Sequence, residues 1–315
     1  MILYKYLPPT RTDIVLNYKI RFTQYGDFND PFELNPNINK IAEENEIKEL
    51  LKKDFVQLIE EEYCKNPVIN AFISKDAFVQ LARIGENFVK DAVVDIEPSV
   101  VTMLPWILQK TANSLLGALS LSEIYNHELM WSHYAEEHKG YVIGFNSSHS
   151  FFNQKKSPDD ELHHLRKIEY RESPPEINLM KTIGAELFFV KSSKWKYEAE
   201  WRMLLPLSES AEIIDKHPFP IYLFTFPSEA INRIILGTKL NAETKKTIKS
   251  ELMSNKNLSH VELYQARLDS SSYRILLKKK RANKALHRIL NSGEKPPPLR
   301  TDELQRYRMC AKCFF

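Results

Sequence analysis

NHELMWSHYAEEHKGYVIGF, the stretch from Asn126 to Phe145, combines a helix signal, a stop and a strand signal. Asn126 is a favourable N-cap, because its side chain can accept a hydrogen bond from the first free backbone amides of a helix. Gly140 is a favourable stop, because glycine enters the left-handed region without a Cβ clash. The residues from Tyr141 to Phe145 alternate as in a half-buried strand. The sequence therefore predicts a short helix and a core strand, with polar aromatic side chains at their junction.

Short strands are predicted on both sides of this stretch. The N-terminal part should contain strands at Leu3–Tyr6 and Lys19–Thr23, with a helix at Thr10–Tyr18 between them. Further strands are expected at Ala118–Leu121, Gly140–Phe145, Lys167–Arg171, Glu198–Leu205, Ile221–Phe226, Ile234–Gly237 and Val261–Gln265. A helix is expected at Asn241–Ser254. Because strands and helices do not alternate strictly, the pattern indicates an α+β fold with a mixed, largely antiparallel sheet.

Two segments depart from this pattern. From about residue 40 to residue 116, apolar residues recur at helical spacing, which predicts an all-helical insertion with runs at Ile41–Cys64, Lys75–Val94 and Val100–Leu116. Residues 278–315 contain eleven Lys or Arg and three Asp or Glu, whereas the rest of the chain carries a net charge of −5. We therefore expect an α+β catalytic-type domain at residues 1–277 and a basic C-terminal tail at residues 278–315.

The composition of the chain indicates the cellular compartment in which the protein is expected. The chain has no run of about 18 apolar residues, so no membrane span is expected. It has three cysteines, too few for the disulfide framework of a secreted protein, and no signal-peptide core near Met1. These observations predict a cytoplasmic protein that does not bind membranes. The basic tail is expected to attract nucleic acid or an acidic protein through counterion release, or else to form a solvated helix.

The strongest candidate for a catalytic site is the group formed by Glu198, Glu200 and Arg202. On the expected strand, residues two apart share a face, which would put two carboxylates about 7 Å apart with a guanidinium beside one. Such a pair can stabilise charge or act in acid/base catalysis. The alternative is a solvent-facing strand with a cross-strand ion pair. Nearby aromatic residues, including Trp195, favour a lined cleft.

Other candidate site residues come from separate parts of the sequence. His133 and His138 lie five apart, so they do not share a helix face as a metal-binding pair would, and no metal ligand is assigned. We expect the catalytic residues to be Glu200, Glu198, Arg202, His133 and Tyr134. We expect the substrate-binding residues to be Lys5, Tyr6, Asn29, Asp30, Trp131 and Trp195.

Four ordered motifs resemble a bacterial family known as domain of unknown function 2971. They are LYKY at residues 3–6, FNDPFE at 28–33, LMWSHYAEEHKGYVIGF at 129–145 and KWKYEAEWRMLL at 194–205. The resemblance covers roughly residues 1–265 and is interrupted by the helical insertion. The family name implies no activity, so the chemistry has to be argued from the residues.

The spacing of Glu198 and Glu200 also resembles the carboxylate pair of arginine-type ADP-ribosyltransferases. In those enzymes the second glutamate stabilises the oxocarbenium-like ribose as nicotinamide leaves. An early strand supplies a basic residue or histidine, and a middle strand supplies a serine or tyrosine. The resemblance implies that Lys5 takes the first place and Ser132 or Tyr134 the second. The chain departs from the pattern, because lysine is not the usual first residue and because Ser132 and Tyr134 fall on the expected helix.

The leading hypothesis is a bacterial enzyme that acts on a nucleotide-like substrate, with ADP-ribosyl transfer as its candidate reaction and NAD as a candidate substrate. A defence or toxin role is what families of this kind suggest. Glu200 would face the reacting ribose and Glu198 would orient the acceptor, while Tyr134 or Trp131 would stack on a ring.

Two other functions stay open. The first is a metal-dependent nuclease or phosphoesterase, whose ligands would be Asp30, Glu33, His133 and His138. The second is a non-enzymatic regulatory or partner-binding protein that docks through the tail and the insertion helices.

Overall fold

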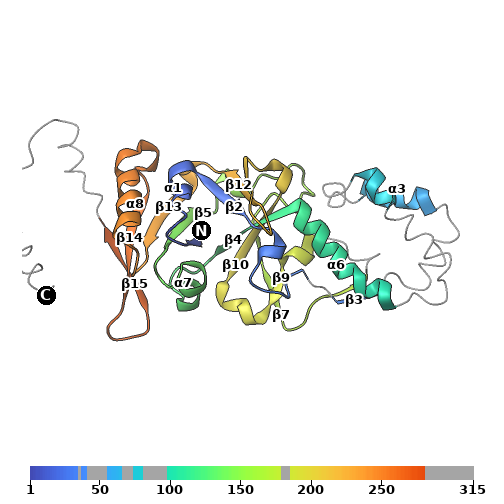
Figure 1. Cartoon of the computed structure of the whole chain (residues 1–315), viewed down its shortest axis with the longest axis horizontal. Helices are drawn as coiled ribbons and strands as arrows, with labels where there is room; N and C mark the ends of the chain where they lie inside the picture. Colours follow the sequence, from blue (N-terminus) through green and yellow to red (C-terminus); the bar gives the residue numbers. More distant parts are fainter. Residues whose placement is uncertain (35–36, 41–54, 66–73, 81–97, 179–184, 281–315) are drawn as a thin grey trace, which may run out of the picture.

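A large sheet organises the computed structural model, which describes residues 1–34, 37–40, 55–65, 74–80, 98–178 and 185–280 (Figure 1). Its eight strands are, in spatial order, β15 (Ile275–Lys280), β14 (Glu262–Leu268), β13 (Ile231–Leu236), β5 (Tyr141–Asn146), β1 (Ile2–Leu7), β4 (Leu116–Ser122), β10 (Glu200–Pro206) and β6 (Arg166–Lys167). Neighbouring strands run antiparallel, apart from the parallel pair β13 and β14. The predicted α+β fold with a mixed, largely antiparallel sheet is confirmed.

Helices cover both faces of this sheet. The described helices include α1 (Asp13–Asn17), α3 (Phe55–Lys65), α6 (Pro98–Leu115), α7 (Glu128–Tyr134) and α8 (Ala242–Ser254). On one face, Val15 of α1 and Ile248 of α8 share an apolar cluster with Leu3 of β1. On the other face, Trp131 of α7 packs with Tyr6 of β1. Successive side chains of β1 can serve both layers because they point to opposite sides of the strand.

Three smaller sheets surround the large one. They comprise β11 (Glu212–Ile214), β12 (Ile221–Thr225) and β2 (Lys19–Phe22); β3 (Asn37–Lys40) and β8 (Glu176–Asn178); and β7 (Glu169–Arg171) and β9 (Val190–Ser192). A single bridge between Thr23 and Ala118 connects the end of β2 to β4. The strand expected at Lys167–Arg171 is thus divided between two sheets, because its halves pair with different partners.

The predicted insertion is helical at residues 55–65, 75–80 and 98–115. Of the predicted helical runs, residues 41–54 and 81–94 lie outside the described part of the chain. Figure 1 shows α3 and α6 at the end of the molecule opposite α8, β14 and β15. The helix expected at Asn241–Ser254 is confirmed, with the Asn241 side chain accepting a hydrogen bond from the Thr244 amide at 2.8 Å.

The helix and strand expected within Asn126–Phe145 are present, but the caps differ from the prediction. The N-cap residue is His127, and its side chain makes no capping hydrogen bond. The helix α7 ends at Tyr134, well before Gly140. Three consecutive residues with positive φ angles then reverse the chain, namely Glu136, Glu137 and His138.

Gly140 is required for close packing. A Cβ atom at this position would lie 2.0 Å from the carbonyl oxygen of Leu7 and 3.0 Å from that of Ala135. The backbone between α7 and β5 therefore packs directly against the end of β1, which fixes α7 beside the first strand.

The last described strand changes the expected boundary of the tail. β15 continues to Lys280, and Lys278, Lys279 and Lys280 pair with residues of β14. The boundary expected between residues 277 and 278 therefore falls inside the large sheet, and residues 281–315 of the predicted tail lie outside the described part. None of the helices in the described residues has the length and apolar character needed to cross a membrane.

Candidate functional site

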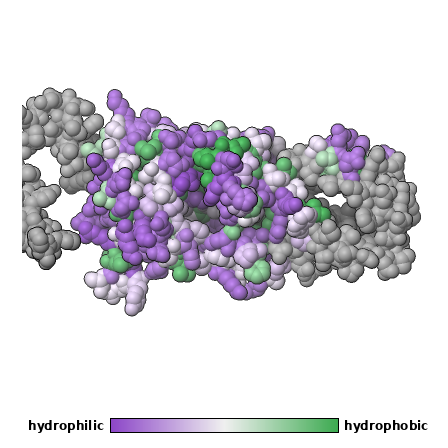
Figure 2. Space-filling view, in the orientation of Figure 1, coloured by the Kyte–Doolittle hydropathy of each residue, from purple (hydrophilic) through white to green (hydrophobic). Residues whose placement is uncertain are grey.

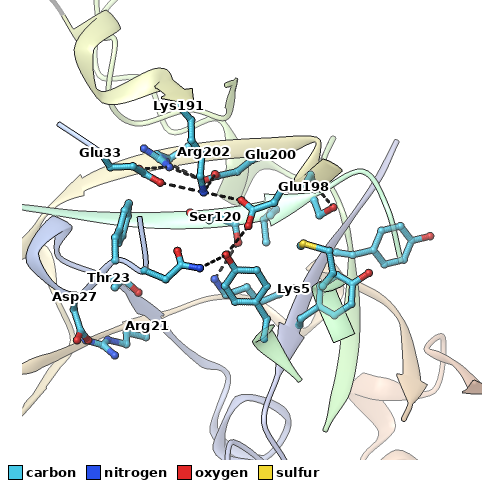
Figure 3. Close-up of a pocket in the computed structure, with 18 residues that line it drawn as sticks. Lys5, Arg21, Thr23, Asp27, Glu33, Ser120, Lys191, Glu198, Glu200 and Arg202 are labelled. Atoms are coloured by element: carbon cyan, nitrogen blue, oxygen red, sulfur yellow. Dashed lines mark hydrogen bonds and ion pairs between the residues drawn. The ribbon is translucent and has the colours of Figure 1, made fainter. Parts of the chain in front are cut away.

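A cavity of about 260 Å³ lies where the large sheet divides between β1 and β4 (Figure 3). β1 pairs with β5 at six positions but with β4 only where Tyr4 faces Ser122. β4 pairs instead with β10 at seven positions. The volume is close to the lower end of the range of about 300–1,000 Å³ that small-molecule sites occupy. The divided sheet therefore forms a site that local sequence patterns do not reveal.

Lys191 of β9 lies at the centre of a buried cluster of charges. Its Nζ lies 2.6 Å from Glu198 Oε2, 3.2 Å from Glu200 Oε2 and 3.0 Å from Glu33 Oε1. Although burial opposes it, these three carboxylates raise the pKa of Lys191 above its ordinary value. The amine therefore stays charged, and it draws together three carboxylates from two parts of the chain.

Arg202 of β10 is the second buried cation of this cluster. Its Nη2 lies 2.7 Å from Glu33 Oε2 and 2.8 Å from Glu200 Oε1, while its Nη1 donates to the Phe188 carbonyl oxygen at 2.8 Å. The ion pairs of Glu33 lack the geometry of hydrogen bonds, and burial raises the pKa of that carboxyl. For Glu200, burial is outweighed by Arg202 and Lys191, which hold its pKa at about 2. Glu200 is therefore ionised at neutral pH.

The two carboxylates of Glu198 and Glu200 reach Lys191 through an irregular backbone. The strand predicted at Glu198–Leu205 begins only at Glu200, because Glu198 ends the 3-10 helix η4 (Ser193–Glu198). Ala199, between them, has a φ angle of 43°. The predicted alternation on one strand is therefore wrong at Glu198, although the predicted proximity of the two carboxylates holds.

Tyr134 connects α7 to this cluster. Its hydroxyl donates to Glu198 Oε1 at 2.5 Å and accepts a hydrogen bond from Asn29 Nδ2 at 2.8 Å. Burial, and then the negative charge of Glu198, raise the pKa of Tyr134. The phenol therefore stays protonated and orients one oxygen of Glu198 within the cavity.

Lys5 of β1 differs in environment from Lys191. It is half-buried and lines the cavity, and its Nζ donates to the Ser120 carbonyl oxygen at 3.0 Å. Among the described residues it makes no ion pair with a carboxylate. Burial lowers the pKa of Lys5 to about 8, and the attraction of Glu200 offsets only part of that effect. This amine is therefore available to an anionic ligand and titrates close to neutral pH.

Seven of the eleven predicted site residues line the cavity. They are Lys5, Tyr6, Asn29, Tyr134, Glu198, Glu200 and Arg202. Tyr6 also donates its hydroxyl to the Ile124 carbonyl oxygen at 2.9 Å.

The remaining four predicted residues do not line it. Trp131 is fully buried, donates to the Tyr125 carbonyl oxygen at 2.8 Å and cannot stack on a ligand. His133 is exposed beside Trp195, and Trp195 lies under the Lys191 amine at 4.9 Å. Asp30 is buried and accepts from the Phe32 amide, so it orders the turn.

Lys191, Ser120 and Ser122 line the cavity but are not among the predicted site residues. Lys191 directly follows the apolar run Leu187–Val190, and a lysine next to such a run is a signal for a buried, paired amine. Ser120 lies on the predicted strand Ala118–Leu121, and Ser122 directly follows it; because the two serines alternate with leucines, their hydroxyls are expected to share a face.

The residues suggested as metal ligands are not gathered in one place. Glu33 belongs to the Lys191 cluster, while the ring of His138 stacks on Trp131 at 5.8 Å. In the described part of the chain, no group of three His, Cys, Asp or Glu residues is placed to hold a metal ion.

Comparison with known families gives one match. Residues 130–203 match the family described as "Protein of unknown function (DUF2971)", which confirms the resemblance predicted from the motifs. The matched segment contains α7 from Met130 onward, β5, Lys191 and the Glu198–Arg202 stretch, whereas the motifs at residues 3–6 and 28–33 lie outside it. No curated protein and no solved structure matches the chain significantly. The family description names no activity.

Proposed function

We propose that the protein is an enzyme that acts on a nucleotide-like substrate in the cavity between β1, β4 and β10, and that it transfers ADP-ribose from NAD. One observation carries this proposal. Strands β1 and β4 and the η4–β10 segment bring a lysine (Lys5), two serines (Ser120 and Ser122) and the Glu198–Glu200 pair to a single cavity. These are the residue types, in the same chain order, that the resemblance to arginine-type ADP-ribosyltransferases implies.

The middle-strand serine comes from a different element than the sequence suggested. Ser132 is exposed on α7 and donates to the Glu128 carbonyl oxygen, so it is not part of the cavity. Ser122 of β4 donates to the Glu198 carbonyl oxygen at 2.6 Å. The Ser120 hydroxyl favours the ionised form of Glu200. Serines of β4 therefore contact both glutamate residues, and in this proposal they take the middle-strand place that Ser132 and Tyr134 did not fit.

The charges in the cavity suit a reaction that develops positive charge. As the bond between nicotinamide and ribose breaks, its electron pair leaves with the nicotinamide ring nitrogen and the ribose becomes oxocarbenium-like. The permanently ionised Glu200 would stabilise that ribose, because a fixed charge in a buried site acts with little screening by water. A nucleophilic acceptor would then bond to the ribose carbon and lose its proton to Glu198, which Tyr134 orients.

Lys5 supports a phosphorylated substrate. In the described part of the cavity, Arg21 pairs with Asp27, and Lys191 and Arg202 pair with glutamates, so Lys5 is the cation left for an added anion. A diphosphate group would supply that anion.

The alternatives receive less support. The nuclease or phosphoesterase hypothesis needs its four suggested ligands in one place, and Glu33 and His138 have separate surroundings. The non-enzymatic hypothesis does not account for a cavity lined by ionised groups. The defence or toxin role stays a prediction from family resemblance.

The direct test is nicotinamide release from NAD by the full chain and by Glu200→Gln. If Glu200 stabilises the transition state, the variant should release nicotinamide about 100-fold or more slowly than the unaltered protein. Chromatography of released nicotinamide measures hydrolysis and transfer together.

Glu33→Gln is the matched control, because Glu33 contacts the same two cations. Both variants should lose thermal stability, since each removes a charge from one buried cluster, but Glu33→Gln should slow the reaction by less than about 10-fold. Equal losses in the two variants would assign Glu200 a structural role only. Failure of the unaltered protein to bind NAD in calorimetry would exclude the proposed substrate.

A further inference from the structure

One face of the β14–β15 edge of the large sheet carries a group of basic side chains that the cavity does not use. Because residues alternate along strands, Arg267 of β14 and Lys278 and Lys280 of β15 point to the same face. This is the face covered by α8, since Lys245 Nζ of that helix donates to Gln265 Oε1 at 2.9 Å. Lys249 lies one helical turn further along α8. These five residues, Lys245, Lys249, Arg267, Lys278 and Lys280, are called the basic face below.

The basic face is not neutralised within the described residues. None of its five members has an ion pair with a described carboxylate, and Arg267 and Lys278 are exposed. Burial, and then the surrounding Arg267, Lys245, Lys278 and Lys249, lower the pKa of Lys280, which indicates that these cations are close together.

On the opposite face of the same strands, the cations share a carboxylate partner. Lys279 contacts Glu262 there, and Arg233 lies 3.7 Å from the same carboxylate. Figure 2 shows hydrophilic side chains over the end of the molecule formed by α8, β14 and β15. The positive charge is therefore concentrated on one side of the sheet edge rather than spread over it.

The sequence continues this charge beyond the last described strand. Residues 281–315 contain eight Lys or Arg and three Asp or Glu. The basic face thus lies where the chain enters a segment with a net positive charge.

We propose that the basic face binds the phosphate backbone of nucleic acid, at a place separate from the cavity and independent of the reaction there. Lysine and arginine side chains without competing carboxylates bind phosphates by releasing counterions, without reading the base sequence. Lys278 and Lys280, two apart on one strand, are spaced by about 7 Å, so each can contact a different phosphate.

Nucleic acid fits this surface better than an acidic protein. Stable protein partners usually bury an apolar or aromatic centre surrounded by a polar rim. On this face of β14 and β15, Leu276 is the exposed apolar residue, whereas Leu263 is buried beneath α8. A phosphate backbone requires no apolar centre.

The test compares two full-length variants with equal loss of charge. The first is Arg267→Gln, Lys278→Gln and Lys280→Gln combined. The matched control is Lys239→Gln, Lys256→Gln and Lys279→Gln combined, which changes exposed lysines outside the basic face. Fluorescence anisotropy would measure binding to duplex DNA and to single-stranded RNA, both about 20 nucleotides long, between about 50 and 300 mM salt.

The unaltered protein should bind both nucleic acids, with log K falling linearly as log salt rises. The first variant should raise Kd about 10-fold at 0.1 M salt and reduce the salt slope by about 2 to 3, whereas the control should change Kd less than about 2-fold. Lys278→Gln alone, at an exposed site that leaves the fold undisturbed, should reduce the slope by about 1.

Three results would overturn the proposal: no binding by the unaltered protein at the lowest salt, equal binding by the two variants, or no slope change in Lys278→Gln. Labelled polyglutamate of the same length is a further probe. If it bound as tightly as nucleic acid and lost affinity in the same variant, the surface would recognise acidic polypeptides instead.

Discussion

Two lysines in one cavity have opposite electrostatic surroundings. Three carboxylates surround Lys191 and raise its pKa, whereas Lys5 is desolvated without an ion pair and has a pKa of about 8. Lys191 therefore acts as a fixed part of the structure at any pH that the fold tolerates. Lys5 changes charge over a range that an assay can cover, since it is cationic below pH 8 and neutral above it.

The protonation state of the Lys5 amine should control the affinity for the substrate. If its ammonium group binds the diphosphate of NAD, Kd should stay level below about pH 8 and rise as much as about tenfold per pH unit above it. Lys5→Arg should keep its charge and remove this dependence, because arginine does not titrate in this range. Calorimetry between about pH 6.5 and pH 9.5 measures both proteins. An affinity that falls with pH equally in Lys5→Arg would contradict the assignment.

At the scale of elements, the turn between α7 and β5 holds the helix that carries Tyr134. Glu136, Glu137 and His138 adopt positive φ angles, which L residues rarely combine, and Gly140 then packs on the Leu7 carbonyl group of β1. The geometry depends on this contact because any side chain at residue 140 would collide with backbone rather than with a movable side chain.

Gly140→Ala should therefore destabilise the protein by about 1–3 kcal/mol or more, because a methyl group must be forced into a packed site. It should also weaken any activity that needs Tyr134, since α7 would shift relative to β1. Thermal unfolding measures the first effect, with the exposed neighbour Lys139→Ala as a control that should change stability by less than about 0.5 kcal/mol. Equal melting temperatures in the two variants would show that the contact can relax.

At the scale of the whole molecule, the large sheet is continuous on either side of its middle but divided between β1 and β4. β1 and β4 share a single register pair, so the strands from β15 to β1 and those from β4 to β6 diverge around the cavity. Residues remote in sequence, such as Glu33, Lys191 and Glu200, then meet in the opening. The hydrogen bond from Lys5 Nζ to the Ser120 carbonyl oxygen crosses between the two halves at that point.

The boundary of the large sheet can be tested by comparing residues 1–277 with residues 1–280. The shorter chain lacks Lys278, Lys279 and Lys280, which pair with Gln265, Tyr264 and Leu263. Because those strand contacts are lost and the edge of β14 is opened, the shorter chain should melt at a lower temperature and aggregate more readily than the longer one. Identical melting curves would place the stable end of the domain before residue 278.

Local patterns in the sequence were sufficient for much of the fold. Local patterns placed β1, β5 and α8 close to their observed bounds, although β5 is buried on both faces and not half-buried as its alternation suggested. The same patterns brought Glu198, Glu200 and Tyr134 into consideration as site residues. They could not show that Trp131 is core, since an amphipathic helix does not reveal which partner covers it.

Tertiary structure alone decided the composition of the cavity. The predicted strand containing Ser120 gave no sign that its neighbours would be β10 and, at a single position, β1. Lys191 meets Glu33 across more than a hundred residues of intervening chain, and Gly140 meets Leu7 across a similar distance in sequence. The sequence by itself determined which residues are apolar, charged or able to turn. Strand pairing determined which of them meet, because non-local contacts leave no periodic signal along the chain.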